Sequence, residues 1–172
     1  MKPLSLIVAM SENRVIGREG DLPWHLPDDM KWFVNKTKGH QVIMGRANFD
    51  SIGNKPLPNR HNIILTRDKN YSLTEEAMAT GEITVVQSMQ DAINIAQSQD
   101  DEPFIIGGEQ IYKAALPFVT RMYITLVHTH VEGDRFFPNF NPSDFEVTEK
   151  TEHPADDRHI YPFTFITYER SS

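Results

Sequence analysis

Five short apolar runs rich in Ile and Val alternate along the chain with segments of helical pattern. The runs cover residues 4–10, 41–44, 62–66, 83–86 and 104–106. Runs without polar alternation are typical of strands that are covered on both faces, as in a parallel sheet. Helices are expected at 28–38, 46–52, 88–97 and 109–116, the third with a capping box formed by Ser88 and Asp91. This order predicts an α/β fold.

The pattern changes after Pro117. Residues 121–130, 144–151 and 161–168 are long β-rich stretches with period-two character and no helix between them. We therefore expect a single domain over residues 1–172, with a mostly parallel central sheet, an antiparallel C-terminal edge and helices on both faces. Ligands of such sheets bind beyond the carboxyl ends of the strands. Residues 11–27, the longest segment that fits neither pattern, are expected to form a lid or a binding loop.

The charge of the chain limits the classes of partner. With 17 Lys and Arg residues against 24 Asp and Glu residues, the formal charge is −7, which disfavours nucleic acid. The apolar run at 4–10 is too short to span a membrane, and no signal-peptide cleavage site follows it. With no cysteine and no export signal, the chain is expected in the cytoplasm. The acidic tracts at 75–76 and 100–102 are expected to be solvated loops.

Two predicted strands end in glycine and lead directly into a helix, at Gly45-Arg46 and at Gly107-Gly108. Such a junction lets the backbone approach a phosphate closely, although one alone is more often structural. Two at corresponding places, with Arg46 at one and Arg67 just past another strand, indicate a dinucleotide with an extra phosphate. The chain has no GxGxxG segment, so the Rossmann fingerprint is absent.

Asp29 lies in the first turn of the predicted 28–38 helix. A carboxylate at this position commonly complements the helix dipole, which is the simplest interpretation. However, Trp32 and Phe33 follow it at helical spacing on the same side, and Asp28 can serve the dipole instead. Asp29 is therefore also a candidate for binding a cationic or amidine-like heterocycle, or for a raised pKa.

Other catalytic patterns are weak or absent. His128 and His130 share a face of a predicted strand, but no third ligand appears at suitable spacing, so no metal is expected and the pair is interpreted as part of a solvated strand. No Gly-x-Ser-x-Gly segment supports serine hydrolase chemistry, and no Walker A lysine motif is present.

Seven separate segments carry a resemblance to a known family. They are Val15-Ile-Gly17, Leu22-Pro-Trp-His-Leu-Pro-Asp-Asp29, Ile43-Met-Gly-Arg46, Phe49-Asp-Ser-Ile-Gly53, Pro56-Leu-Pro-Asn-Arg60, Ile106-Gly-Gly108 and Gly133-Asp134. In this order and at this spacing, they resemble dihydrofolate reductases of the bacterial chromosomal type, over about residues 4–169. The resemblance implies that family's fold and the NADPH-dependent reduction of 7,8-dihydrofolate to tetrahydrofolate by a monomer. That reaction feeds one-carbon metabolism and is a target of antifolates.

The resemblance also implies the roles of individual residues. Asp29 would be the sole acidic group of the pterin pocket, with Thr125 bonded behind it, and Arg60 would hold the α-carboxylate of the glutamate tail. The catalytic positions would be Asp29, Leu22 and Trp24, with a proton taken from water admitted near Asp29. Further substrate contacts would be Ile7, Ala9, Phe33, Ile52, Leu57 and Ile106. NADPH would contact Ala9, Ile16, Gly17, Leu22, Gly45, Arg46, Ala47, Asn48, Thr66, Arg67, Ile106, Gly107, Gly108, Glu109, Gln110 and Ile111, with a cis peptide joining Gly107 to Gly108.

A mobile loop is implied as well, and the family pattern is not matched everywhere. Residues 16, 17 and 22 would belong to a loop over the nicotinamide, supported by residues 132–134. Phe49 stands where the family often has Trp, Asn48 where Thr is frequent and Leu22 where Met is familiar. Glu109 follows the glycine pair directly, and an acid there lowers the affinity for a diphosphate unless its side chain turns away.

Two alternatives fit the residues less well. Reductases of a ribosylaminopyrimidine in flavin synthesis share the architecture, but their substrate has no glutamate carboxylate for Arg60 to bind. A phosphoacceptor signalling domain is also α/β and acidic. It needs an acidic pair after the first strand and a lysine after the fifth, whereas this chain has Met10-Ser11 and Gly107-Gly108 there.

Overall fold

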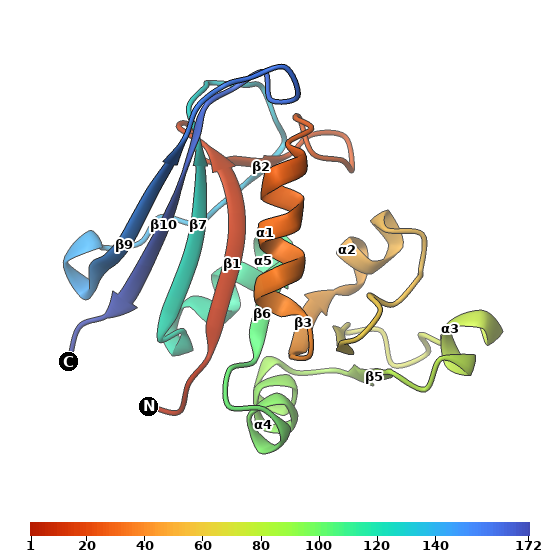
Figure 1. The fold of residues 1–172 in the computed structure, drawn as a ribbon. Helices are drawn as coiled ribbons and strands as arrows, with labels where there is room; N and C mark the ends of the chain where they lie inside the picture. Colours follow the sequence, from red (N-terminus) through yellow and green to blue (C-terminus); the bar gives the residue numbers. More distant parts are fainter.

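An eight-stranded sheet runs through the centre of the computed structural model, which describes all of residues 1–172 (Figure 1). Its spatial order is β5-β4-β3-β6-β1-β7-β10-β9. The strands are β1 Ser5–Ser11, β3 Gln41–Gly45, β4 His61–Leu65, β5 Ile83–Val86, β6 Phe104–Gly107, β7 Arg121–Val127, β9 Phe145–His153 and β10 Phe163–Arg170. The pairs from β5 to β7 are parallel, and β10 is antiparallel to both β7 and β9. The predicted parallel sheet with an antiparallel C-terminal edge is confirmed.

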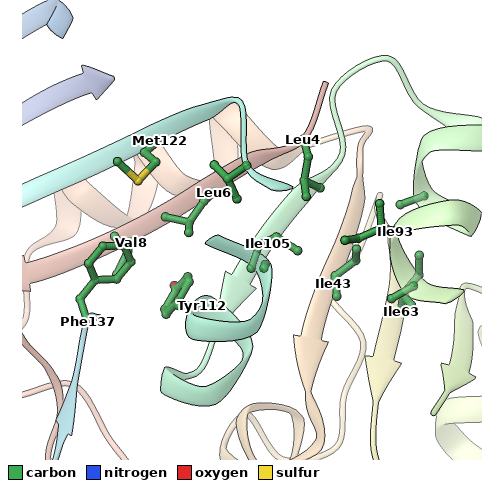
Figure 2. Packing of buried hydrophobic residues seen from close by; sticks show 14 of the residues in the cluster. Leu4, Leu6, Val8, Ile43, Ile63, Ile93, Ile105, Tyr112, Met122 and Phe137 are labelled. Carbon is green, nitrogen blue, oxygen red and sulfur yellow. The ribbon is translucent and has the colours of Figure 1, made fainter. Parts of the chain in front are cut away.

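Helices cover both faces of this sheet, as predicted. They are α1 Pro27–Thr37, α2 Arg46–Ser51, α3 Glu75–Ala79, α4 Met89–Gln99 and α5 Glu109–Ala115, with short 3-10 segments at Leu116–Phe118 and Pro142–Asp144. Alternate residues of β1 point to opposite faces. Leu6 and Val8 pack in one cluster with Ile93 of α4 and Tyr112 of α5 (Figure 2). Ile7 belongs to the other cluster, on the side of α1, α2 and α3.

Three short elements were not predicted. Strands β2 (Val15–Gly17) and β8 (Arg135–Phe136) form a separate two-stranded antiparallel sheet, so the 11–27 segment is not wholly irregular. The Glu75-Glu76 tract lies in helix α3, so the prediction that it forms a loop is wrong, although both side chains are exposed. The Thr74 hydroxyl caps α3 by accepting the Ala77 N–H at 3.1 Å. The strand predicted at 121–130 ends at Val127, so His128 and His130 lie beyond it.

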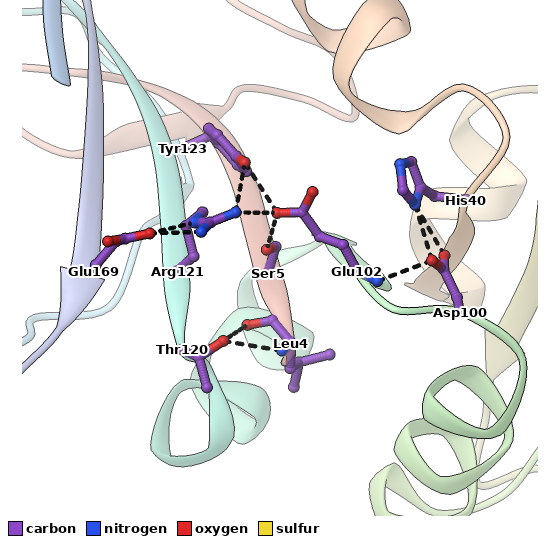
Figure 3. Close-up of polar contacts among 9 residues, drawn as sticks. All are labelled: Leu4, Ser5, His40, Asp100, Glu102, Thr120, Arg121, Tyr123 and Glu169. Carbon is purple, nitrogen blue, oxygen red and sulfur yellow. Dashed lines mark hydrogen bonds and ion pairs between the residues drawn. The ribbon is translucent and has the colours of Figure 1, made fainter. Parts of the chain in front are cut away.

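The second acidic tract is also not a simple solvated loop. The Glu102 carboxylate accepts hydrogen bonds from the Ser5 hydroxyl at 2.9 Å, the Arg121 guanidinium at 2.8 Å and the Tyr123 hydroxyl at 2.9 Å (Figure 3). Asp100 accepts the Gln41 N–H at 2.7 Å. These contacts join the amino ends of β1, β3 and β7, opposite the edge where ligands of parallel sheets bind. No helix in the structure combines the length and apolarity needed to cross a bilayer.

Candidate active site

Many of the predicted site residues lie at or near the carboxyl ends of the parallel strands, whereas Arg60 directly precedes β4 at the opposite edge. Parallel strands end at one edge of a sheet, so segments far apart in sequence meet there. The residues at this edge are Ile7 and Ala9 on β1; Gly45 at the end of β3 and Arg46, Ala47 and Asn48 on α2; Thr66 and Arg67 after β4; Ile106 and Gly107 on β6; Gly108, Glu109, Gln110 and Ile111 at the start of α5; and Thr125 on β7.

Glycine allows a close approach at this edge. A Cβ atom on Gly45 would lie 2.8 Å from Cγ1 of Ile111, so the end of β3 can contact the start of α5 only without a side chain. Gly107 has a φ of 126°, a conformation that L-amino acids rarely adopt. The peptide joining Gly107 to Gly108 is cis, as the resemblance implies. The Tyr112 hydroxyl beside it shares its proton between the carbonyl oxygens of Ile7, at 2.8 Å, and Ile106, at 2.9 Å.

Asp29 is a buried carboxyl group that no cation neutralises. It lies in the first turn of α1, is 8% exposed, and forms no ion pair. Its one side-chain partner is the Thr125 hydroxyl, which donates to Oδ1 at 2.7 Å. Burial raises the pKa of Asp29, although the Thr125 hydrogen bond opposes that shift. The predicted raised pKa and the predicted Thr125 contact are both present.

Remote residues hold the start of α1 in place. Leu26, at the N-cap position, has no side chain that can cap the helix, and the Asp28 N–H instead donates to Nε2 of the fully buried His159 at 3.0 Å. The Asp28 carboxylate bonds His153 at 2.8 Å and Arg158 at 3.0 Å. Sequence reasoning missed this group, because its members lie more than a hundred positions apart. From the sequence, Asp28 was expected only to complement the dipole of the helix.

A cavity of about 450 Å³ opens beside Asp29. Leu22, Trp24 and Met30 line it together with Asp29. The Trp24 indole N–H is buried and has no hydrogen-bond partner, so it is free to donate to a ligand or a water in this region. Leu22 and Met30 leave large apolar surfaces exposed, as do Val34 and Ile52. Met30 was missed, although it precedes Phe33 by three residues on α1, a spacing that places both on one side of the helix.

Arg60 is the second buried charge without a counter-ion. Its side chain donates to the Pro58 carbonyl oxygen at 2.9 Å and to the Thr37 hydroxyl at 3.0 Å, and its guanidinium lies 5.9 Å from the centre of the Phe33 ring. It is 6% exposed and forms no ion pair, and burial lowers its pKa. Buried arginines are usually paired with an anion. The Arg60 guanidinium can therefore pair with an anionic ligand.

Helix α1 sets the separation of the two unpaired charges. Asp29 lies in its first turn and Thr37, which bonds Arg60, is its last residue. Eight positions correspond to roughly 12 Å along a helix. Ile7 packs between these ends with Phe33, Leu57 and Ile106 in one apolar cluster. A ligand that satisfies both charges therefore has a cationic or hydrogen-bonding ring at one end, an apolar middle and an anion at the other end.

The two arginines expected at a phosphate differ in their surroundings. Arg46 already contacts two carboxylates, Asp68 at 3.1 Å and Asp50 at 3.6 Å, and lies 4.6 Å from the centre of the Tyr71 ring. Arg67 is exposed and forms no ion pair. An additional phosphate therefore has to compete with Asp68 for Arg46.

Ile16 and Gly17, which are predicted to belong to a lid, lie on β2, and β2 pairs with β8. The Asp134 N–H donates to the Gly17 carbonyl oxygen at 3.0 Å, and the Glu19 N–H donates to the Asp134 carboxylate at 3.2 Å. The predicted contact between the lid and residues 132–134 is therefore present. The Glu109 carboxylate turns toward β8 and accepts the Phe136 N–H at 2.6 Å.

The α/β sheet has glycine junctions at its carboxyl edge, and two charged groups without counter-ions lie at the two ends of α1. This combination defines a class: a small enzyme that can hold an elongated ligand, with opposite charges at its two ends, beside a nucleotide. Comparison with known proteins narrows this class. The family model described as dihydrofolate reductase matches residues 3–170. The chain is 40% identical to dihydrofolate reductase of Bacillus subtilis (strain 168), covering 98% of this chain and 95% of the other, and 42% identical to that of Staphylococcus haemolyticus, covering 97% and 95%.

A solved structure agrees with these sequences. Dihydrofolate reductase from Enterococcus faecalis, complexed with NADP(H) and RAB-propyl, superposes with a TM-score of 0.90 at 34% identity, covering 99% of this chain and 98% of that chain. The chain belongs to the dihydrofolate reductase family. It is an oxidoreductase whose reaction is the NADPH-dependent reduction of 7,8-dihydrofolate to tetrahydrofolate.

Proposed function

We propose that dihydrofolate lies along α1, with its pterin ring at Asp29 and its glutamate α-carboxylate at Arg60. The observation that carries this proposal is the pair of buried charges, each without a counter-ion, at the two ends of one helix. The amidine-like edge of the pterin can donate to the Asp29 carboxylate, and a planar guanidinium can grip a carboxylate at two points. Ile7, Phe33, Ile52, Leu57 and Ile106 contact the apolar middle of the substrate.

The glycine-ended strands β3 and β6 form the cofactor side of the cleft. Gly45 packs against Ile111 without room for a side chain, which brings the end of β3 close to the start of α5. Arg46 and Arg67 bind the additional phosphate, and Thr66, Ala47 and Asn48 line the adenosine end. Ala9, Ile16, Gly17, Leu22, Gly107, Gly108, Glu109 and Gln110 complete the contacts. NADPH, when bound, supplies the hydride that the imine carbon of the pterin accepts.

The residues of the chain orient the pterin ring and position the source of the one proton that the reaction needs. Asp29 holds the pterin edge, and Thr125 fixes the carboxyl group through Oδ1. The unpartnered Trp24 indole N–H can hold a water near Asp29. The nitrogen beside the reduced carbon takes its proton from that water, which regains one from solvent. Leu22 and the β2 segment cover the reacting centre and exclude bulk water.

The proposal also covers the oligomeric state of the enzyme, its compartment and its partners. One domain over residues 1–172 carries all the proposed site residues, which supports a monomer that needs no second chain, and the lack of cysteine fits the proposed cytoplasmic location. The formal charge of −7 supports the absence of nucleic acid among its partners. Sedimentation of the purified protein at micromolar concentration tests whether it is a monomer, since a dimer would give twice the mass of one chain.

NADPH oxidation tests the proposal as a whole. The purified chain should oxidise NADPH only when dihydrofolate is present, and it should use NADH less well because NADH lacks the additional phosphate. Replacing dihydrofolate with the ribosylaminopyrimidine substrate of flavin synthesis is the matched control. Turnover of that compound without turnover of dihydrofolate would contradict the proposal.

A further inference from the structure

Strand β8 supports the lid, and the contacts between them are tight. A Cβ atom on Gly133, just before β8, would lie 2.2 Å from Cγ1 of Val15 and 2.7 Å from the carbonyl oxygen of Gly17. The Phe137 N–H, just after β8, donates to the Arg14 carbonyl oxygen at 2.9 Å. Movement of β8 therefore moves the β2 segment of the lid with it.

Strand β8 is itself held against α5 by two contacts. The fully buried Phe137 ring packs edge-on against Tyr112, with 5.3 Å between ring centres (Figure 2). The second contact is the hydrogen bond of 2.6 Å from the Phe136 N–H to Oε1 of Glu109. Because β8 pairs with β2 on one side only, the Glu109 carboxylate takes the place of a neighbouring strand on the other side.

Glu109 is also the first residue of α5, directly after Gly108. One residue thus belongs to the cofactor side of the cleft through its backbone and to the lid support through its side chain. An acid next to a diphosphate is unfavourable by its charge alone. The hydrogen bond from Phe136 gives this carboxylate a structural role, because it holds β8.

We infer that Glu109 is a positioning residue for hydride transfer, whose carboxylate holds β8, and through it the closed lid, against the start of α5. This inference rests on the proposed NADPH side of the cleft. A charge-assisted hydrogen bond in a half-exposed setting stabilises the closed form modestly, so its loss should slow the chemical step by about three- to tenfold.

Two neutral variants separate the hydrogen bond from the charge. Glu109→Gln keeps an acceptor oxygen for the Phe136 N–H, and Glu109→Ala removes it, while both remove the negative charge beside the cofactor. Both variants should bind NADPH at least as tightly as the unaltered chain. Glu109→Ala should slow hydride transfer by this amount in single-turnover experiments and Glu109→Gln by clearly less, with a primary isotope effect from deuterated NADPH identifying that step. Lys113→Ala, one turn further along exposed α5 surface, is the matched control and should match the unaltered rate.

Three results would overturn the inference. They are an unaltered hydride rate in Glu109→Ala, an equal slowing in Glu109→Gln and Glu109→Ala, and a change confined to NADPH affinity. Melting temperatures of all variants confirm that the compared proteins are folded. Failure of the unaltered chain to oxidise NADPH with dihydrofolate would instead contradict the proposed function, so the two failures are distinguishable.

Discussion

At the scale of single residues, Asp29 shows how burial can favour function over stability. Its raised pKa means that the folded protein binds a proton more tightly than the unfolded chain does. The contribution of Asp29 to stability therefore becomes less favourable as the pH rises from its ordinary pKa of 3.8 through the raised value. At any pH where this carboxyl group is ionised, its burial without a counter-ion costs folding free energy.

Asp29→Asn should accordingly separate stability from activity. The variant removes the buried charge but keeps an acceptor for Thr125, so its melting temperature at pH 7 should equal or exceed that of the unaltered chain. Dihydrofolate turnover should fall by at least about 10- to 100-fold, since a charge-assisted hydrogen bond and proton delivery are both lost. NADPH binding should not change. Thermal melts and steady-state kinetics check this, and near-normal turnover at neutral pH would refute the role of Asp29.

Helical spacing was enough to single out Asp29 from the sequence, because Trp32 and Phe33 repeat at the period of a helix. The absence of any cation beside the carboxyl group could not be read in the same way. It depends on which side chains β7 and the loop before α1 bring close in space. The buried Arg60 likewise has no local signal that distinguishes it from an exposed arginine.

At the scale of elements, the start of α1 depends on the β9–β10 connection. Asp28 has its pKa lowered, first by the hydrogen bond from His153, and the pKa of His153 is raised because bonds to Asp28 and the Pro154 carbonyl outweigh desolvation. The Asp28 contribution is present above its ordinary pKa of 3.8 and is lost as the pH falls through its lowered value. The His153 contribution is complete below its ordinary pKa of 6.5 and is lost as the pH rises through the raised value.

His153→Gln should therefore lower the melting temperature most at pH 5 to 6 and much less at pH 8.5. Arg158 and His159, which also contact Asp28, and Asp156, which contacts His159, remain in this variant. His130→Gln is the matched control, because the His130 side chain is 74% exposed and its nearest carboxylate, that of Glu12, lies as far away as 3.9 Å. An equal loss at both pH values would show that the Asp28–His153 ion pair does not contribute.

Gly133→Ala should disturb the lid without touching either ligand. The added Cβ atom overlaps the Gly17 carbonyl oxygen, which is backbone and can move only with β2. Depopulating the closed lid by about 1.4 kcal/mol would slow hydride transfer up to tenfold. Single-turnover kinetics measure this step, with the exposed neighbour variant Glu132→Ala as control. An unchanged rate in folded Gly133→Ala would show that the lid is not coupled to the chemistry.

Long elements were predictable from local pattern, and short ones were not. The parallel strands and α4 carry their own periodicity, and the Ser88 cap of α4 is confirmed by its bond to the Asp91 N–H at 3.1 Å. Strands β2 and β8 contain three and two residues and pair across the length of the chain. Such pairs are set by tertiary contacts rather than by alternation, so no window of sequence reveals them.

At the scale of the whole molecule, a chain of formal charge −7 has to bind two anionic ligands. Because the net negative charge of the chain repels anions at long range, the few cationic side chains near the site have a large effect on the binding of these ligands. Replacing both Arg46 and Arg67 with Ala should reduce the preference for NADPH over NADH, whereas Asp68→Asn should increase it by freeing Arg46. Ratios of kcat/KM for the two cofactors measure both effects. Equal use of NADPH and NADH by the unaltered chain would contradict the assignment.

The proposed function places one elongated substrate along α1, between the two charged groups that lack counter-ions. The most direct test compares kcat/KM for dihydrofolate and for a dihydropterin without the glutamate tail, in the unaltered chain, Arg60→Lys and Arg60→Leu. Arg60→Leu should lower the value for dihydrofolate by about 10- to 100-fold, mainly through KM, and leave the tailless substrate within about twofold. Arg60→Lys should fall between them, because it keeps the charge but loses the two-point grip. Equal losses for both substrates in Arg60→Leu would mean that Arg60 is structural and that the substrate does not span α1.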